Sequence, residues 1–220
     1  MSADQFARLR QADWEDLESV ESVTLPLLAS LGSSPELLGA LLEELRSDDE
    51  MLKLCEHYDA LDKVVLYNDA ETGVRLRLHV FLPGHFDRAH NHRWTFSSVV
   101  LRGSYRHSIF RTMEALSETT DPSALEPVLV RTESRNTPYT LHHSAIHSVV
   151  ADPFTISLVL RGPAVKNRLL NLDRETGKTW WSYGAENESP TEADSHRMTA
   201  ARLDEVANYL LDAGVIHNVR

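Results

Sequence analysis

Two histidines separated by a single residue, His90 and His92, are the side chains of this sequence best spaced to act together. They lie in a stretch that we predict to be a β-strand, where residues i and i+2 point to the same face. Two imidazoles on one face can bind a single metal ion, since neutral histidine is the commonest metal ligand in proteins. The same spacing also occurs in ordinary surface pairs. The surrounding residues must therefore decide between a metal site and a surface pair.

The residues around this pair resemble the first sequence motif of the cupin family. That motif consists of a glycine, a short spacer, His-x-His, a glutamate and a final glycine. Four residues of this chain fall at the matching positions: Gly84, His90, His92 and Gly103. Phe96 and Ser97 stand where the glutamate could be, and His147 is the counterpart of the histidine that ends the second cupin motif. The resemblance implies a β-barrel that holds one divalent metal ion through His90, His92 and His147.

Within the cupins, the stretch from about residue 60 to residue 165 is most similar to the thiol dioxygenases, of which cysteine dioxygenase is the best known. Those enzymes also bind iron with three histidines and lack the glutamate. The resemblance implies an Fe(II) oxygenase that uses O₂ on a small thiol, amino-acid-like or carboxylate substrate.

The chain departs from the dioxygenases at several positions. They carry Ser, His and Tyr at alternate positions after the third ligand, where this chain has Ser157, Val159 and Arg161. Ser97 replaces a cysteine of the animal-type enzymes, and Lys63 is the nearest counterpart of an arginine that binds carboxylate. Cysteine itself is therefore not the expected substrate.

Strand alternation suggests which side chains surround the metal. If His90 and His92 face the barrel interior, then Trp94, Phe96 and Ser98 follow them inward. On the preceding strand, one face carries Arg75, Arg77, His79 and Phe81, and the other face carries Val74, Leu76, Leu78 and Val80. The family register places the arginine face inside, whereas hydrophobic periodicity alone would place it in solvent.

Two arginines facing inward would bind an anion, since the guanidinium group matches a carboxylate with two hydrogen bonds. The alternative for Arg161 is a salt bridge to a carboxylate within the barrel. The candidate substrate-binding residues are Arg77, Arg161, Trp94 and Phe96. The candidate catalytic residues are Arg161, Ser157 and His143. The last could be a proton carrier, a fourth ligand or a partner of a ligand, or an ordinary histidine of the surface or core.

We predict that these residues are positioned by an all-β core with helices at both ends of the chain. Residues from about 12 to 57 are predicted helical, with Ser34 and Pro35 starting a helix over the leucine-rich stretch 37–58. Many short strands between turn residues fill 61–185, which favours a jelly-roll barrel over a parallel sheet. A polar linker precedes a C-terminal helix that ends at Gly214. We expect a single cupin domain over 1–220, divided into 1–60, 61–185 and 186–220.

Composition limits the remaining choices. Twenty-two basic and 33 acidic residues give a net charge of −11, so neither nucleic acid nor an anionic membrane surface is an expected partner. The sequence contains no apolar run long enough for a membrane span and no signal-like N-terminus. A single cysteine, Cys55, cannot form an internal disulfide, which fits the cytoplasm. The terminal helices could support a homodimer.

Three functions are compatible with this sequence. The first is a mononuclear Fe(II) oxygenase acting with O₂ on a small anionic or zwitterionic substrate. The second is a non-redox cupin enzyme, an isomerase, lyase or hydrolase, that uses Zn, Mn or Ni as a Lewis acid. The third is a cupin that binds a small molecule without catalysis. The fold alone does not choose among them, because one fold serves many chemistries.

Overall fold

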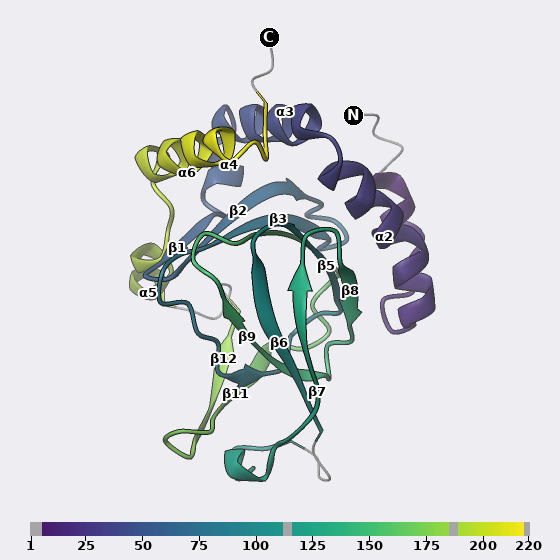
Figure 1. Ribbon diagram of the computed structural model, residues 1–220, viewed down its shortest axis with the longest axis vertical. Coiled ribbons are helices and arrows are strands. Elements are labelled where there is room, and N and C mark those ends of the chain that lie inside the picture. Colours follow the sequence, from purple (N-terminus) through teal and green to yellow (C-terminus); the bar gives the residue numbers. More distant parts are fainter. Residues whose placement is uncertain (1–5, 112–115, 185–188, 218–220) are drawn as a thin grey trace.

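The computed structural model describes residues 6–111, 116–184 and 189–217, and its core consists of two antiparallel sheets of six strands each (Figure 1). Sheet A has the order β1 (Glu56–Tyr58), β2 (Leu61–Asn68), β3 (Arg75–Phe81), β10 (Ile156–Arg161), β5 (Phe96–Arg102) and β8 (Pro138–Leu141). Sheet B has the order β12 (Lys178–Tyr183), β11 (Arg168–Asp173), β4 (Ala89–His90), β9 (Ile146–Ala151), β6 (Ser104–Arg111) and β7 (Glu126–Ser134).

The order in which the strands pair identifies a jelly roll. In order outward from the middle of the chain, β6 pairs with β7, β5 with β8, β4 with β9 and β3 with β10, all antiparallel. The chain therefore folds as one long double-stranded hairpin wound into two sheets, which is the jelly-roll pattern. The predicted all-β core is confirmed.

Helices cover the outer face of sheet A. In Figure 1, α3 (Pro35–Arg46) and α6 (Ala200–Asp212) lie over β2 and β3, and α2 (Leu17–Gly32) runs beside β5 and β8. Buried aliphatic side chains from the helices and the sheet form one cluster, which includes Leu28, Leu31 and Leu42 together with Leu76, Leu78, Ile156, Leu158 and Leu160. Burial of this area supplies the main stabilising free energy of the helical layer.

The opposite faces of the same strands line the barrel interior. On β10, Ser157, Val159 and Arg161 alternate with the aliphatic residues, and on β3 the arginine-bearing residues do the same. Arg77 and Arg161 are each only 8% exposed. The arginine face therefore lies inside the barrel, as the family register implied. The aliphatic face is also buried, but it lies on the outside of the barrel beneath the helices. Hydrophobic periodicity found a buried face correctly but assigned it to the wrong layer.

Several expected boundaries need correction. The helix predicted over 37–58 ends at Arg46, and Asp48 then caps a separate short helix, α4 (Asp49–Leu52), by accepting hydrogen bonds from the backbone of Glu50 and Met51. Cys55 lies after α4 and outside any helix, where it is fully buried, and burial raises its pKa to about 11. Strands β1 and β8 were not predicted, and the expected linker contains the helix α5 (Pro190–Ser195).

Other features of the termini agree with the prediction. Pro35 occupies the first turn of α3 after Ser34, and Gly214 follows the end of α6 with a φ of 67°. The expected segments 1–60 and 186–220 also include residues 1–5, 186–188 and 218–220, which lie outside the described residues. Among the described helices, none alone is long and apolar enough to cross a membrane; α2 and α3 meet the length and composition criteria only together, with a bend of 95° between them.

The layered packing generates a stability prediction. Leu158 on β10 is fully buried beneath the helices, so Leu158→Ala should lower the free energy of unfolding by about 2–5 kcal/mol through lost burial and a residual cavity. Leu129 on β7 is 42% exposed, and Leu129→Ala should change stability by less than about 0.5 kcal/mol. Urea denaturation followed by circular dichroism measures both. Equal losses in the two variants would contradict the layer assignment.

Candidate metal centre

Three histidines come together inside the barrel, two of them on the neighbouring strands β4 and β9 and the third just after β4. His90 ends β4 and lies directly opposite His147 on β9, while His92 follows two residues after His90. One ring nitrogen from each of the three lies within 4.8 Å of the others. The predicted ligand set is therefore brought together by the fold, although β4 ends at His90 and His92 is not part of a strand.

The residue between the two histidines holds His92 in place where the strand has ended. Asn91 is buried, and its Oδ1 accepts a hydrogen bond from the backbone N–H of Leu170 on β11 at 2.9 Å. The backbone N–H of His92 donates to the carbonyl of His143 at 3.2 Å. These contacts replace a strand ladder and fix the direction of the His92 side chain.

Hydrogen bonds on the far side of two rings determine which nitrogen is free. His90 Nδ1 lies 2.8 Å from the carbonyl oxygen of Arg88, so it carries the proton and leaves the lone pair on Nε2. His147 Nδ1 lies 2.9 Å from His107 Nε2, and His107 Nδ1 lies 2.9 Å from Glu133 Oε1. Because Glu133 accepts, His107 donates from Nδ1 and accepts on Nε2, and His147 must then donate from Nδ1. The Nε2 lone pair of His147 is left to face His92.

This chain of side chains is buried: His107 is 0% exposed and Glu133 2%. Arg131 Nε, 2.5 Å from Glu133 Oε1, supports the carboxylate from the outer side. Although burial opposes ionisation, hydrogen bonds from His107 and Arg131 hold the pKa of Glu133 below its usual value. Carboxylate–histidine pairs of this kind orient metal-binding imidazoles and raise their basicity.

The chemistry of the donor set fits a metal cation. His92 Nε2 and His147 Nε2 face each other at 2.6 Å, so their lone pairs need a proton or a cation between them. Burial lowers the pKa of His92 and His147 well below the usual range, so both rings are neutral, which is the form in which histidine binds a metal ion. Three neutral nitrogens are fewer ligands than a divalent ion takes, so an ion held here would keep positions for water or substrate.

Aromatic side chains predicted to face inward surround the histidines. The Phe96 ring centroid lies 4.6 Å from that of His92 and 5.8 Å from that of His147. The Trp94 ring lies 6.3 Å from His92. Ser98, also predicted inward, approaches the hydroxyl of Tyr105 at 3.5 Å. Phe96 and Trp94 thus form an apolar wall beside the centre.

The two predicted arginines gather around the same tryptophan. The Arg161 guanidinium lies 4.3 Å from the Trp94 ring centroid and that of Arg77 lies 5.9 Å away. Arg77 has Glu56 at 3.9 Å, whereas Arg161 donates only to the carbonyls of Gly73 and Gly162. Within the described residues no carboxylate lies within ion-pair distance of Arg161, so the expected alternative of an internal salt bridge is not found. Burial and the charge of Arg77 lower the pKa of Arg161 to about 8.

The side chain of His143 points away from the three histidines. Its Nε2 lies 3.1 Å from Glu15 Oε2, and its ring centroid lies 4.0 Å from that of His142, with the two rings tilted. The contact of His143 with the centre is through its backbone, since its carbonyl accepts from His92 and from Lys166 Nζ. Its geometry therefore favours support of a ligand over direct ligation.

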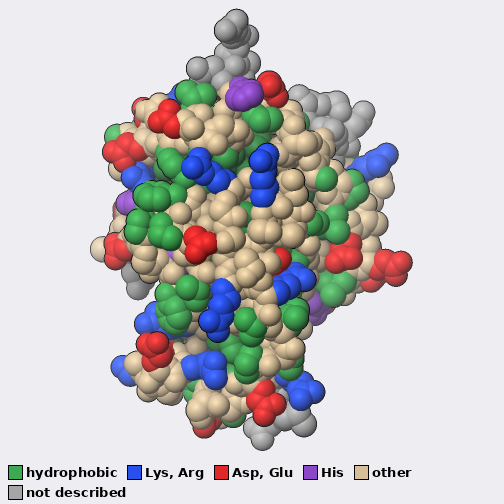
Figure 2. Space-filling view, viewed as in Figure 1, with side chains coloured by type: hydrophobic (Ala, Val, Ile, Leu, Met, Phe, Trp, Pro, Cys, Tyr) green, Lys and Arg blue, Asp and Glu red, His purple; other side chains and the backbone are tan. Residues whose placement is uncertain are grey.

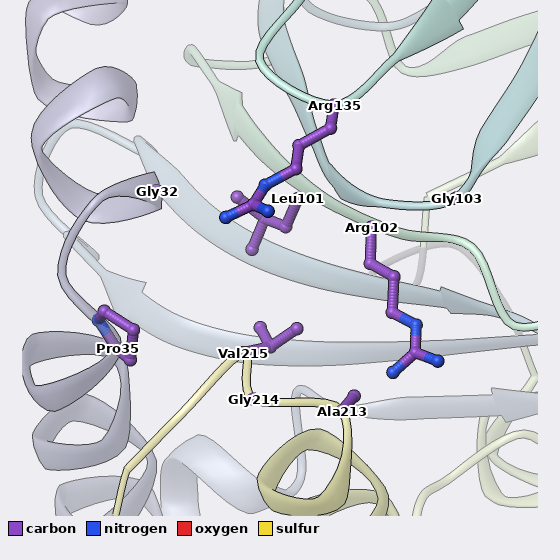
Figure 3. Close-up of a pocket in the computed structure, with 9 residues that line it drawn as sticks. All are labelled: Gly32, Pro35, Leu101, Arg102, Gly103, Arg135, Ala213, Gly214 and Val215. Atoms are coloured by element: carbon purple, nitrogen blue, oxygen red, sulfur yellow. The ribbon is translucent and has the colours of Figure 1, made fainter.

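Sequence reasoning missed His107, Glu133 and Asn91. His107 could have been found, because on β6 it shares the face of Tyr105 and Ile109, and a histidine in an apolar inward row needs a polar partner. Glu133 is the only buried residue of β7, a strand whose sequence gives no sign of an inner carboxylate. A pocket of about 330 Å³ lined by Arg102, Arg135 and the turn after α6 (Figure 3) includes none of the three histidines.

Comparison with known proteins adds similarity of fold alone. No protein-family model and no curated protein matches the chain. KdgF from Halomonas sp. is 16% identical, with a TM-score of 0.36 over 48% of this chain and 82% of that one. An RmlC-like cupin from Ralstonia eutropha is 12% identical, with a TM-score of 0.38 over 74% and 82%. The DMSP lyase DddQ from Ruegeria pomeroyi is 11% identical, with a TM-score of 0.37 over 50% and 51%. Similarity this distant carries no argument about substrate or reaction, so function must be inferred from the site.

The buried hydrogen-bond chain predicts a role in metal affinity for a residue that touches no metal. His107→Phe should weaken Zn(II) binding about 10–100-fold, because His147 loses the acceptor that fixes its proton on Nδ1. His217→Phe is the matched control, since His217 is exposed and pairs only with Glu36. Competition with a chromophoric chelator measures both. Wild-type affinity in a folded His107→Phe protein would refute the role.

Proposed function

We propose that this chain is a mononuclear metal enzyme of the cupin type whose ion is bound by His90, His92 and His147, and that with Fe(II) it oxidises a small anionic or zwitterionic substrate with O₂. The observation that carries the proposal is the convergence of three imidazoles, His147 buried and His90 and His92 half-buried, with the lone pair of His147 directed inward by His107 and Glu133. A bound ion would supply Lewis acidity and, as Fe(II), a site for O₂ chemistry.

The surrounding residues would bind and orient the substrate. Phe96 and Trp94 exclude water beside the histidines, which strengthens every electrostatic interaction there. Arg77 and Arg161 are the groups for a substrate carboxylate, and neither is fully neutralised by a protein carboxylate. Ser157 lies on the same inner face of β10 as Arg161. His143 would act by holding the backbone of His92.

A second candidate is a non-redox enzyme that uses Zn, Mn or Ni as a Lewis acid. One observation favours it: at the positions where the thiol dioxygenases carry His and Tyr, the inner face of β10 presents Val159 and Arg161. The nearest phenols, Tyr105 and Tyr139, hydrogen-bond to each other at 3.0 Å and are buried. An oxygenase here would have to work without that His–Tyr pair.

Metal analysis of protein purified from metal-supplemented growth tests the proposal. We expect about one equivalent of iron in the wild type, lost in His90→Ala because two ligands cannot hold the ion, and retained in His217→Ala. Oxygen-uptake screens with small thiols, hydroxy acids and amino acids then test the reaction. Zinc or nickel with activity in the absence of O₂ would favour the second candidate. No metal in the wild type would eliminate both.

A further inference from the structure

Four buried polar atoms that have no hydrogen-bond partner among the described residues lie on two adjacent strands of the barrel wall. They are Arg77 Nε and His79 Nε2 on β3, and Ser157 Oγ and Arg161 Nε on β10. In the antiparallel register Ser157 is directly opposite His79, and Val159 is opposite Arg77. All four belong to the inward-facing rows. They therefore form one continuous polar patch, which we call the β3–β10 patch.

The polar atoms of the β3–β10 patch are shielded from solvent. Ser157 is 1% exposed and Arg77 and Arg161 are each 8% exposed, so bulk water does not satisfy them. A buried donor or acceptor without a partner carries its full desolvation penalty, and native proteins have few of them. Four on neighbouring positions indicate a surface built to be completed by a ligand.

The charge of the patch defines one half of that ligand. Arg77, Arg161 and Lys63 face the interior against the carboxylate of Glu56, which lies 3.0 Å from Lys63 and 3.9 Å from Arg77. The net charge of these four side chains is positive, which favours the binding of an anion. The ionised Glu56 beside Arg77 disfavours a dianion such as phosphate. A single carboxylate, which an arginine binds with two hydrogen bonds, matches this surface.

The other half of the patch is uncharged. Burial and the charges of Lys63 and Arg77 lower the pKa of His79 well below its usual value, so its imidazole is neutral beside the Ser157 hydroxyl. Together they offer a donor and an acceptor to a neutral polar group. An ammonium group would be repelled by Lys63 and the two arginines, which disfavours an amino acid.

The patch adjoins the three-histidine centre. Arg161 is the direct cross-strand partner of Phe96 on β5, and the Phe96 ring lies 4.6 Å from His92. A molecule held on the patch would therefore lie beside the metal ligands.

We propose that the β3–β10 patch is the substrate cradle, in which Arg77 and Arg161 bind a carboxylate while His79 and Ser157 bind a hydroxyl or thiol of the same molecule. The substrate class is thus a small hydroxy or mercapto monocarboxylic acid, in preference to an amino acid. This deepens the proposed function and rests on it for the identity of the neighbouring centre.

Isothermal titration of the protein as purified with propionate, lactate and alanine tests the cradle, since these probes share one skeleton and differ at one group. We expect lactate to bind about tenfold more tightly than propionate, as one additional good hydrogen bond allows, and alanine to bind most weakly. Arg161→Met should weaken both acids by at least about 30-fold. Ser157→Ala and His79→Leu should abolish the preference for lactate and leave propionate binding unchanged.

Arg106→Met, on the exposed face of β6, is the matched control and should bind all probes as the wild type does. Lactate preference that survives in both Ser157→Ala and His79→Leu would come from chelation of the metal and would overturn the assignment, as would no acid binding at millimolar concentration. Metal content measured on the same samples separates the two proposals. Metal with no acid binding refutes the cradle alone, whereas arginine-dependent acid binding without metal refutes the enzyme proposal alone.

Discussion

The constraint on which the molecule depends is that sheet A is buried on both faces by different means. Leu76, Leu78, Leu158 and Leu160 turn outward and pack beneath α2, α3 and α6, so most of the apolar burial of this sheet takes place outside the barrel. The inner face, where Phe81, Phe96 and Val100 belong to a smaller apolar cluster, therefore supplies less of the hydrophobic stability. It can carry Arg77, Arg161 and Lys63, side chains that a barrel stabilised from within could not accommodate without losing its core.

The same division explains the difference between the two sheets at the metal centre. Sheet B supplies the candidate ligands from β4, from the residues just after it, and from β9. Polar contacts hold them in place: Asn91 accepts a hydrogen bond from β11, and His107 and Glu133 connect β6 and β7 to His147. Sheet A supplies the aromatic wall and the charged groups. In the proposed function, metal binding and substrate binding thus fall on opposite walls of one interior, and strands at several sequence positions must close correctly before either site is complete.

The sequence predicted the parts of this arrangement that depend on short-range spacing. Alternation along β3, β5 and β10 separated the two faces of each strand, the family register implied which face lies inside, and the His90–His92 pair lies where the family motif implied. Contacts between distant segments could not be predicted: Glu133 lies on β7, a strand that is otherwise exposed, and it reaches His147 only through His107 on β6. The predicted helix over 37–58 is too long, because leucine periodicity gives no sign that the backbone turns at Asp48. There the Asp48 carboxylate accepts hydrogen bonds from the backbone N–H groups of the next turn and so starts a new helix.

The net charge of the whole chain is negative, whereas the inner face of sheet A carries a net positive charge. The chain carries −11 overall, and on the face seen in Figure 2 basic and acidic side chains are interspersed, without a continuous basic stripe. The inner face of sheet A, in contrast, carries Arg77, Arg161 and Lys63 against the carboxylate of Glu56. Diffuse surface charge is screened within about a Debye length, roughly 8–10 Å in physiological salt, whereas the interior charges act in a medium of low dielectric constant. In the proposed function, a small anionic substrate would therefore meet weak repulsion on approach and strong attraction once inside. The placement of charge would thus favour small anions before any specific contact is formed.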